Sequence, residues 1–239
     1  MLILPDIHGR SFWRKPMEDA LKSSKPVIFL GDYIDPYDYE GISPAEALSG
    51  FKEIVTLKKA HPGQITLLLG NHDLHYLYWK LEGGRLDWLH KEEIKAFILE
   101  NADCFQMATA VRMPKGNILF SHAGILDGWL KKYPRLFTSR DGEAIASVLN
   151  GMWADEPLRE KLFKILSDVS YSRWGNSRYG SPVWSDVDDI RRDAKEIPEW
   201  YQIFGHSQQE TYPVFTQHFA CLDCRKAFRL DEDGNLTFI

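Results

Sequence analysis

The stretch LLLGNHD at residues 67–73 places three polar side chains, those of Asn71, His72 and Asp73, directly after an apolar run. Four further apolar runs also end in polar residues of the same chemical types. In chain order, the polar residues after the five runs are Asp6 and His8, Asp32 and Asp35, Asn71, His72 and Asp73, His122, and His206. Carboxylate, imidazole and amide groups suit borderline metal ions such as Mn, Fe, Zn or Ni. The set exceeds what one zinc ion needs, so it predicts two metal ions that share a bridging carboxylate.

Each short motif also has an ordinary structural explanation when it is taken alone. Gly-Asp is common in turns, Asn and Asp cap helices, and a lone histidine such as His122 is more often a hydrogen-bonded core residue. Five donor groups that each follow an apolar run are, however, hard to obtain by chance. We therefore expect one metal site rather than five unrelated structural features.

The five apolar runs predict short buried strands that must position these donors. They lie at residues 2–4, 27–30, 65–69, 118–120 and 201–204. In an open α/β sheet, ligands bind outside the carboxyl ends of the strands. The polar residues that follow the strands are therefore expected to meet.

Helical patterns separate the strands, first as alternating strands and helices and later with more antiparallel pairing. The clearest helix covers residues 43–60, where Ser43 and Glu46 predict a capping box and Pro44 suits the first turn. The other predicted elements are a helix at 91–100, two helices within 139–168 broken near Pro157, and hairpins at 106–121 and 226–239, the second with its turn at Asp233-Gly234.

Composition narrows the class of protein. The 239 residues carry a net charge of −5 without a basic block, which disfavours a nucleic-acid partner. No apolar run approaches the roughly 18–20 residues that cross a bilayer, and no signal peptide is visible, so a membrane is not expected. The three cysteines, Cys104, Cys221 and Cys224, favour a reduced, cytoplasmic protein and a structural role for Cys221-x-x-Cys224. The sequence carries no signal for an oligomeric state.

With these motifs in place, the sequence resembles the calcineurin-like metallophosphoesterase superfamily. The matching segments are Asp6-Ile7-His8, Gly31-Asp32-Tyr33-Ile34-Asp35, Gly70-Asn71-His72-Asp73, Ser121-His122-Ala123-Gly124 and Gly205-His206. Gly9, Ala123-Gly124 and the segment SPVWSD at 181–186 make it most similar to the phosphoprotein (Ser/Thr) phosphatase branch of bacterial type. Gln208 stands where other branches carry a second histidine, and the phosphoprotein phosphatase branch lacks that histidine as well.

The resemblance implies an α/β fold in which two mixed sheets pack as a sandwich flanked by helices (αββα). It places a dimetal site at the carboxyl ends of the strands. We expect a single domain over residues 1–239, with a helical insertion around 127–180.

The resemblance also implies roles for the site residues. Asp6, His8 and Asp32 would bind the first ion, and Asp32, Asn71, His122 and His206 the second. A hydroxide that bridges the ions would attack phosphorus in line. His72 would act as general acid and Asp35 would orient its ring. Asp73 would be structural, as a cap or as a hydrogen-bond acceptor behind the ligands.

The sequence departs from the family pattern where phosphate should be bound. Pro36-Tyr37 replaces the Arg-Gly that follows Gly-Asp-x-x-Asp in phosphoprotein phosphatases, and Asp186 stands where bacterial relatives often carry an arginine. Without the two parallel hydrogen bonds that an arginine guanidinium donates to phosphate, phosphate is bound more weakly and is less well oriented. Arg10 is the candidate replacement, and Arg173 and Arg178 are further candidates.

These departures leave the reaction class intact and keep the substrate open among small molecules, nucleotides and phosphoproteins. The leading hypothesis is a phosphomonoesterase of the Ser/Thr phosphatase-like type. The alternatives are a nucleotide phosphohydrolase similar to diadenosine tetraphosphatases, a phosphodiesterase or nuclease, and a non-catalytic metal-binding scaffold.

Overall fold

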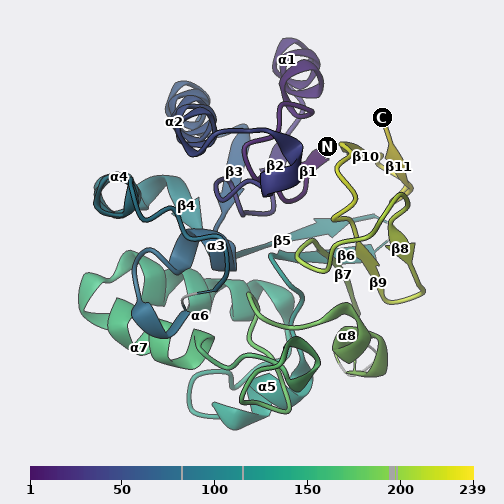
Figure 1. Ribbon diagram of the computed structural model, residues 1–239. Coiled ribbons are helices and arrows are strands. Elements are labelled where there is room, and N and C mark those ends of the chain that lie inside the picture. The colour runs from purple at the N-terminus through teal and green to yellow at the C-terminus, as the bar shows by residue number, and fades with distance from the viewer. Residues whose placement is uncertain (82, 115, 194–196, 198) are drawn as a thin grey trace. The chain divides into compact units, whose positions relative to one another are not determined.

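The computed structural model describes residues 1–81, 83–114, 116–193, 197 and 199–239, and it contains two compact units with one mixed sheet each (Figure 1). The first unit comprises Met1–Phe105, Arg225–Asp231 and Asn235–Ile239. The second comprises Gln106–Cys224 and Glu232–Gly234. Among the described residues, no helix is both long and apolar enough to cross a membrane.

The sheet of the first unit has three parallel strands at its centre, β1 (Leu2–Leu4), β2 (Val27–Phe29) and β3 (Ile65–Leu68). Such strands read as continuous apolar runs because helices cover parallel sheets. Leu4 pairs with Phe29, and Phe29 pairs with Leu67. The three strands therefore end at one level, which brings the loops that follow them together.

The other elements of the first unit surround these strands. Antiparallel β10 (Phe228–Leu230) and β11 (Leu236–Phe238) extend the sheet beyond β1, and β4 (Phe105–Gln106) lies beyond β3. The helices are α1 (Arg14–Lys22), α2 (Pro44–Ala60), α3 (Asn71–Leu74) and α4 (Lys91–Glu100), with 3-10 turns η1 (Asp38–Glu40), η2 (Trp79–Leu81) and η3 (Ala102–Cys104). The predicted capping box is present: the Glu46 N–H donates to Ser43 Oγ and Glu46 Oε2 accepts from the Ser43 N–H.

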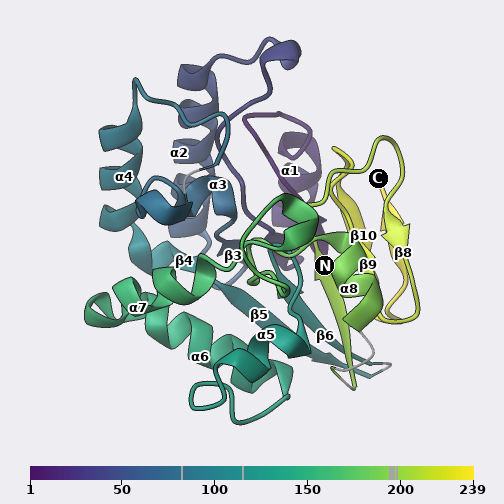
Figure 2. The same ribbon diagram turned by 60° about the horizontal axis from the view of Figure 1, so that its bottom comes forward.

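The second unit is built on the sheet β5-β6-β7-β9-β8, and Figure 2 shows β5 beside β6. These strands are β5 (Ala108–Met113), β6 (Gly116–Ser121), β7 (Trp200–Phe204), β8 (Val214–Phe215) and β9 (Phe219–Cys221). Strands β6 and β7 are parallel neighbours, so both end on the same side. Between them the chain forms α5 (Asp127–Lys132), α6 (Gly142–Ala154), α7 (Glu156–Leu166), η4 (Tyr171–Arg173) and α8 (Val187–Asp193).

Most predicted elements are confirmed, including the five strands, both hairpins and the helix at 91–100. The helix break predicted near Pro157 comes two residues earlier, at Asp155, because proline fits the first turn of α7 without losing a helical hydrogen bond. Two mixed sheets with helices match the expected α/β organisation. The packing of the sheets as a sandwich, the single domain and the helical insertion stay predictions.

Asp127 at the start of α5 is expected to make the second unit sensitive to acid. Burial alone would raise the pKa of the Asp127 carboxyl. Hydrogen bonds from Lys131 and Arg140 lower this pKa by more than burial raises it, so the net shift is downward. A depressed folded-state pKa stabilises the fold above the unfolded value of about 4, and this contribution is lost as the pH falls through the folded-state pKa.

The unfolding free energy of the wild type falls on acidification. We expect this decrease to be about 1 kcal/mol smaller in Asp127→Asn. Urea denaturation at pH 6, 4 and 2.5 measures this loss. Asp188→Asn, at an exposed ion pair with Arg191 on α8, is the control and should keep the wild-type slope. Equal slopes in wild type and Asp127→Asn would contradict the assignment.

Candidate metal and catalytic site

The loops after β1 and β2 bring four predicted site residues together in the first unit: Asp6, His8, Asp32 and Asp35. All four are almost fully buried. The loops are joined directly, because the His8 N–H donates to the Asp32 carbonyl over 2.7 Å. His8, Asp32 and Asp35 have φ angles of 46°, 53° and 59°, a left-handed region that costs non-glycine residues about 1 kcal/mol or more each. Such strain persists where the surrounding structure holds it, and it concentrates at functional sites.

His8 and Asp32 fit a metal ion. His8 Nδ1 lies 2.8 Å from the Ile34 carbonyl oxygen, so Nδ1 carries the proton and Nε2 presents a lone pair. This nitrogen lies 3.5 Å from Asp32 Oδ2, so two electron-pair donors face one small volume. Burial lowers the pKa of His8, and electrostatic interactions with His72, Arg85 and Arg10 lower it further, which favours the neutral ring that binds metals. His8, Asp32 and His72 together form a group whose ligand atoms lie within 4.8 Å of one another.

The predicted pairing of Asp35 with His72 is present. Asp35 Oδ2 accepts from His72 Nδ1 over 2.8 Å and lies 2.6 Å from His75 Nε2, while Oδ1 accepts from the Tyr76 hydroxyl. Burial raises the pKa of Asp35, but the two histidine contacts lower it more. Burial lowers the pKa of His72 to about 4, although Asp35 opposes that shift. The His72 ring is therefore held with Nε2 directed away from Asp35, and its catalytic role stays a prediction.

Asp73 holds the loops after β2 and β3 together. Its carboxylate accepts hydrogen bonds from the N–H groups of Gly70 and Asp32, both over 2.8 Å, and of Tyr33, over 3.0 Å. Burial, and next to it the charge of Asp32, raise the pKa of Asp73, while the three N–H groups act in the opposite direction. The geometry agrees with the supporting role predicted for Asp73.

Close packing of the backbone accompanies these contacts. A Cβ at Gly31, where φ is 108°, would lie 2.5 Å from the Gly70 nitrogen. Glycine is therefore required at Gly31 both for its conformation and for this approach. The contact sets the loop of Asp32 directly beside the loop of Asn71, which begins α3.

Asp73→Asn should destabilise the protein by about 2 kcal/mol. The asparagine NH2 group would face a backbone N–H, which leaves buried donors without acceptors. Chemical denaturation measures the change. Asp19→Asn, on the exposed face of α1, is the control and should stay within about 0.5 kcal/mol of wild type; an equally small change in Asp73→Asn would refute the supporting role.

The second unit brings the two other predicted ligands, His122 and His206, together. They follow the parallel neighbours β6 and β7, and the Gly205 N–H donates to the His122 carbonyl. His122 Nε2 lies 3.2 Å from His206 Nδ1, and both residues are buried. The two rings thus direct nitrogens toward one volume, as a shared metal ion requires.

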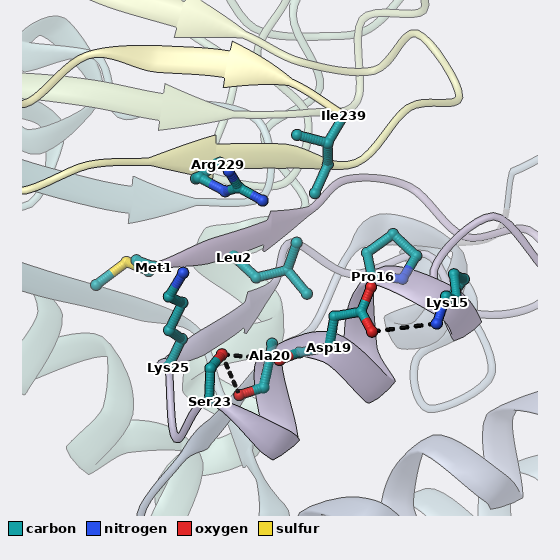
Figure 3. Close-up of a pocket in the computed structure, with 10 residues that line it drawn as sticks. All are labelled: Met1, Leu2, Lys15, Pro16, Asp19, Ala20, Ser23, Lys25, Arg229 and Ile239. Carbon is teal, nitrogen blue, oxygen red and sulfur yellow. Dashed lines mark hydrogen bonds and ion pairs between the residues drawn. The ribbon is translucent and has the colours of Figure 1, made fainter.

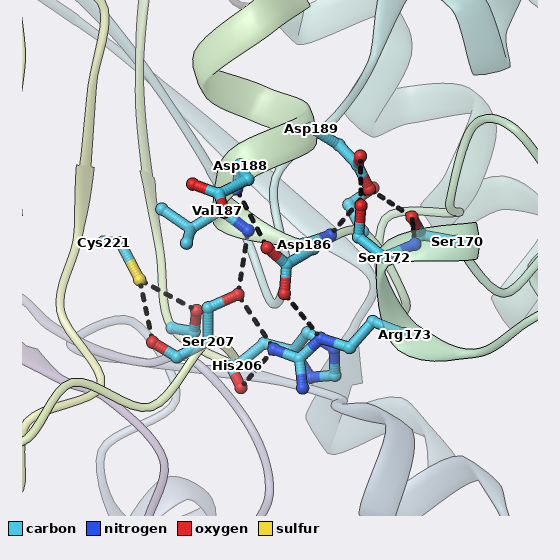
Figure 4. A network of polar contacts seen from close by, with 12 residues as sticks. Ser170, Ser172, Arg173, Asp186, Val187, Asp188, Asp189, His206, Ser207 and Cys221 are labelled. Atoms are coloured by element: carbon cyan, nitrogen blue, oxygen red, sulfur yellow. Dashed lines mark hydrogen bonds and ion pairs between the residues drawn. The ribbon is translucent and has the colours of Figure 1, made fainter.

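The loop of His206 is held by a polar network (Figure 4). Arg173 Nη2 donates to the His206 carbonyl and to Ser207 Oγ, and Arg173 Nε lies 3.0 Å from Asp186 Oδ2. Cys221 Sγ donates to the carbonyl of Ser207, which agrees with a structural role for this cysteine. Arg173 therefore supports the His206 loop and Asp186 balances its charge, which disfavours Arg173 as a phosphate ligand.

The arginine candidates differ in their surroundings. The Arg10 guanidinium is buried, donates from Nε to both carboxylate oxygens of Glu40 and from Nη1 to the Asp6 carbonyl, and so has its charge paired. Arg178 lies in the second unit with its guanidinium 5.3 Å from the Tyr179 ring centroid. Arg10 stays a prediction as a phosphate ligand.

Two neighbours of His72 escaped the sequence analysis, Arg85 and His75. His75 lies three residues after His72, a spacing that places two side chains on one side of a helical turn, so its proximity had a visible signal. The sequence carries no such signal for Arg85, because this residue follows two glycines in an irregular segment. Its Nη2 lies 3.0 Å from His72 Nε2.

A separate pocket of about 280 Å³ lies between α1 and the sheet of the first unit (Figure 3). Its lining includes the cations Lys15, Lys25 and Arg229. It also includes Met1 and Leu2, at the amino end of β1. The candidate site follows the carboxyl ends of the strands, so this pocket is not part of it.

Comparisons with known proteins identify a family for this chain. A family model described as calcineurin-like phosphoesterase matches residues 1–210. No curated protein matches the chain significantly. The fold is similar to that of a serine/threonine phosphatase from Saccharomyces cerevisiae, which is described as similar to human phosphatase PP5. The TM-score is 0.55 and the sequences are 14% identical, and the match covers 100% of this chain and 78% of that chain. A hypothetical protein, PH1004 from Pyrococcus horikoshii OT3, has a TM-score of 0.49 and 9% identity, covering 100% of this chain and 86% of that chain.

Proposed function

The chain belongs to the calcineurin-like phosphoesterase family, and we propose that it is a phosphomonoesterase of the Ser/Thr phosphatase-like type that works with two metal ions. The enzyme class, a metal-dependent phosphoesterase, follows from the family and from the buried His/Asp groups. The substrate and the identity of the metal are the parts that we propose.

Six residues would hold the ions: Asp6, His8 and Asp32 the first, and Asp32, Asn71, His122 and His206 the second. The close pairs His8–Asp32 and His122–His206 support this division. The donors suit Mn, Fe, Zn or Ni. When bound, two such ions lower the pKa of a shared water and stabilise the charge of the phosphate.

The observation that carries the proposed reaction is the contact between Asp35 and His72. Asp35 fixes the His72 ring through Nδ1, so Nε2 is the atom that, once it has taken up a proton, can deliver it to the leaving oxygen of the ester. A monoester needs such a donor because its leaving alkoxide or phenoxide is otherwise released with a full negative charge.

Gln208 stands where other superfamily branches carry a second histidine, which argues against a nuclease or a nucleotide phosphodiesterase. The fold similarity to a yeast serine/threonine phosphatase is compatible with a preference for monoesters. We also propose a cytoplasmic location, which the odd count of three cysteines supports.

A substrate panel tests the proposal on manganese-loaded protein. It contains an aryl phosphate, a phosphopeptide, diadenosine tetraphosphate, a bis-aryl phosphate and single-stranded DNA. We expect the aryl phosphate and the phosphopeptide to be hydrolysed fastest. Faster cleavage of diadenosine tetraphosphate would identify a nucleotide phosphohydrolase, and faster cleavage of the bis-aryl phosphate or DNA a phosphodiesterase; either result would overturn the monoesterase assignment.

A further inference from the structure

Arg85 is fixed against both halves of the Asp35–His72 pair. Its Nη1 donates to the Asp35 carbonyl oxygen over 2.8 Å, and its Nη2 lies 3.0 Å from His72 Nε2. The guanidinium carbon lies 3.5 Å from the centroid of the Tyr37 ring, a stacking distance. Three separate groups thus orient one half-buried cation beside the proposed proton donor.

The contacts of Arg85 leave its charge unpaired. A carbonyl, an imidazole nitrogen and an aromatic face are all uncharged partners, and within the described part of the chain Arg85 forms no ion pair with a carboxylate. Arg10 and Arg173, by contrast, are paired with Glu40 and Asp186. A fixed cation without an anionic partner is prepared to receive an anion.

The backbone at Arg85 is also unusual. Its φ angle is 65°, in the left-handed region that side chains with a Cβ rarely adopt. The preceding Gly84 has open space around its Cβ position, so local crowding does not force this turn. The turn directs the guanidinium onto Tyr37 and His72, which gives the strain a function.

We infer that Arg85 is the residue that binds the phosphoryl oxygens of the substrate. The inference rests on the proposed phosphoesterase function. The leaving oxygen must reach His72 Nε2, the atom that Arg85 Nη2 now contacts. A non-bridging phosphate oxygen accepts from Nη2 in place of Nε2. The released Nε2 then takes up a proton from solvent and donates it to the leaving oxygen. One guanidinium thereby places the phosphate and opens the contact that His72 needs.

Arg85→Gly tests the inference without backbone strain, because glycine adopts the same positive φ. Its matched control is Arg225→Gly, since Arg225 has a φ angle of 62° and the substitution removes the same charge. We expect kcat/KM for an aryl phosphate to fall about 10²-fold in Arg85→Gly, and the affinity for inorganic phosphate, measured by calorimetry on manganese-loaded protein, to fall about tenfold. Arg85→Lys should recover part of the phosphate affinity, while the metal content stays at the wild-type level.

The outcomes separate this inference from the proposed function. If the wild type is active and Arg85→Gly equals Arg225→Gly in both readouts, the assignment of Arg85 is overturned. If Arg10→Ala shows the losses of kcat/KM and phosphate affinity expected for Arg85→Gly, and Arg85→Gly shows neither, Arg10 is the phosphate ligand instead. If the wild type hydrolyses no member of the panel, the proposed function fails; weaker phosphate binding in Arg85→Gly then still supports the anion site, and unchanged binding overturns it.

Discussion

His72→Asn is expected to keep both metal ions and to lose most turnover. Asn cannot deliver a proton at the position of Nε2, and general acid catalysis typically contributes about 10²–10⁴-fold. The size of the loss should depend on the leaving group. An alkyl phosphate releases a strongly basic alkoxide, so its kcat should fall about 10⁴-fold, whereas an aryl phosphate, whose leaving group needs less help, should fall about 10²-fold.

Steady-state kinetics on both esters and metal analysis of the same samples measure this effect. His61→Asn is the matched control, because His61 is exposed at the end of α2, and it should match wild type. The leaving-group dependence separates proton donation from a loss of structure, which would slow both esters equally. Unchanged activity in His72→Asn would remove the general-acid assignment.

Asp32→Asn is expected to abolish the site itself. Asp32 is the only carboxylate proposed for both ions, its Oδ2 faces His8 Nε2, and its Oδ1 accepts from the His72 N–H over 2.9 Å. An amide loses the negative charge and turns a donor toward one of these directions. We expect metal content to fall below one ion per chain and kcat/KM to fall about 10³–10⁴-fold, several kcal/mol of transition-state stabilisation.

The control for Asp32→Asn is Asp38→Asn, an exposed carboxylate six residues further along the chain. It should keep full metal content and activity. Circular dichroism on each variant establishes that the fold is retained. Two ions per chain in folded Asp32→Asn would refute its bridging role.

The residues around β1–β3 show how far sequence could predict the site. Apolar runs of three to five residues predict the strands, and parallel pairing in register places the following loops at one level. The donors in those loops were therefore predictable from order and chemical type alone. The same holds for Asp73, whose short distance from Gly70 along the chain suits a local cap.

Contacts between distant segments were not predictable in the same way. The pairing of Arg10 with Glu40 spans 30 residues, and the approach of Arg85 to Asp35 spans 50. Both depend on loop conformations, including positive φ at Arg85, that leave no periodic pattern in the sequence. The sequence thus predicted the donor residues that lie in the loops after the strands, while the cation beside His72 emerged from the structure alone.

The central claim, a dimetal phosphoesterase, is tested most directly by measuring metal content and phosphate release on one sample. The protein is stripped with a chelator, reloaded with manganese in steps, and assayed with an aryl phosphate at each step. We predict that phosphate release rises with occupancy and reaches its maximum at two ions per chain. Fewer than one bound ion per chain after supplementation with manganese or zinc, or release that does not depend on bound metal, would contradict the account.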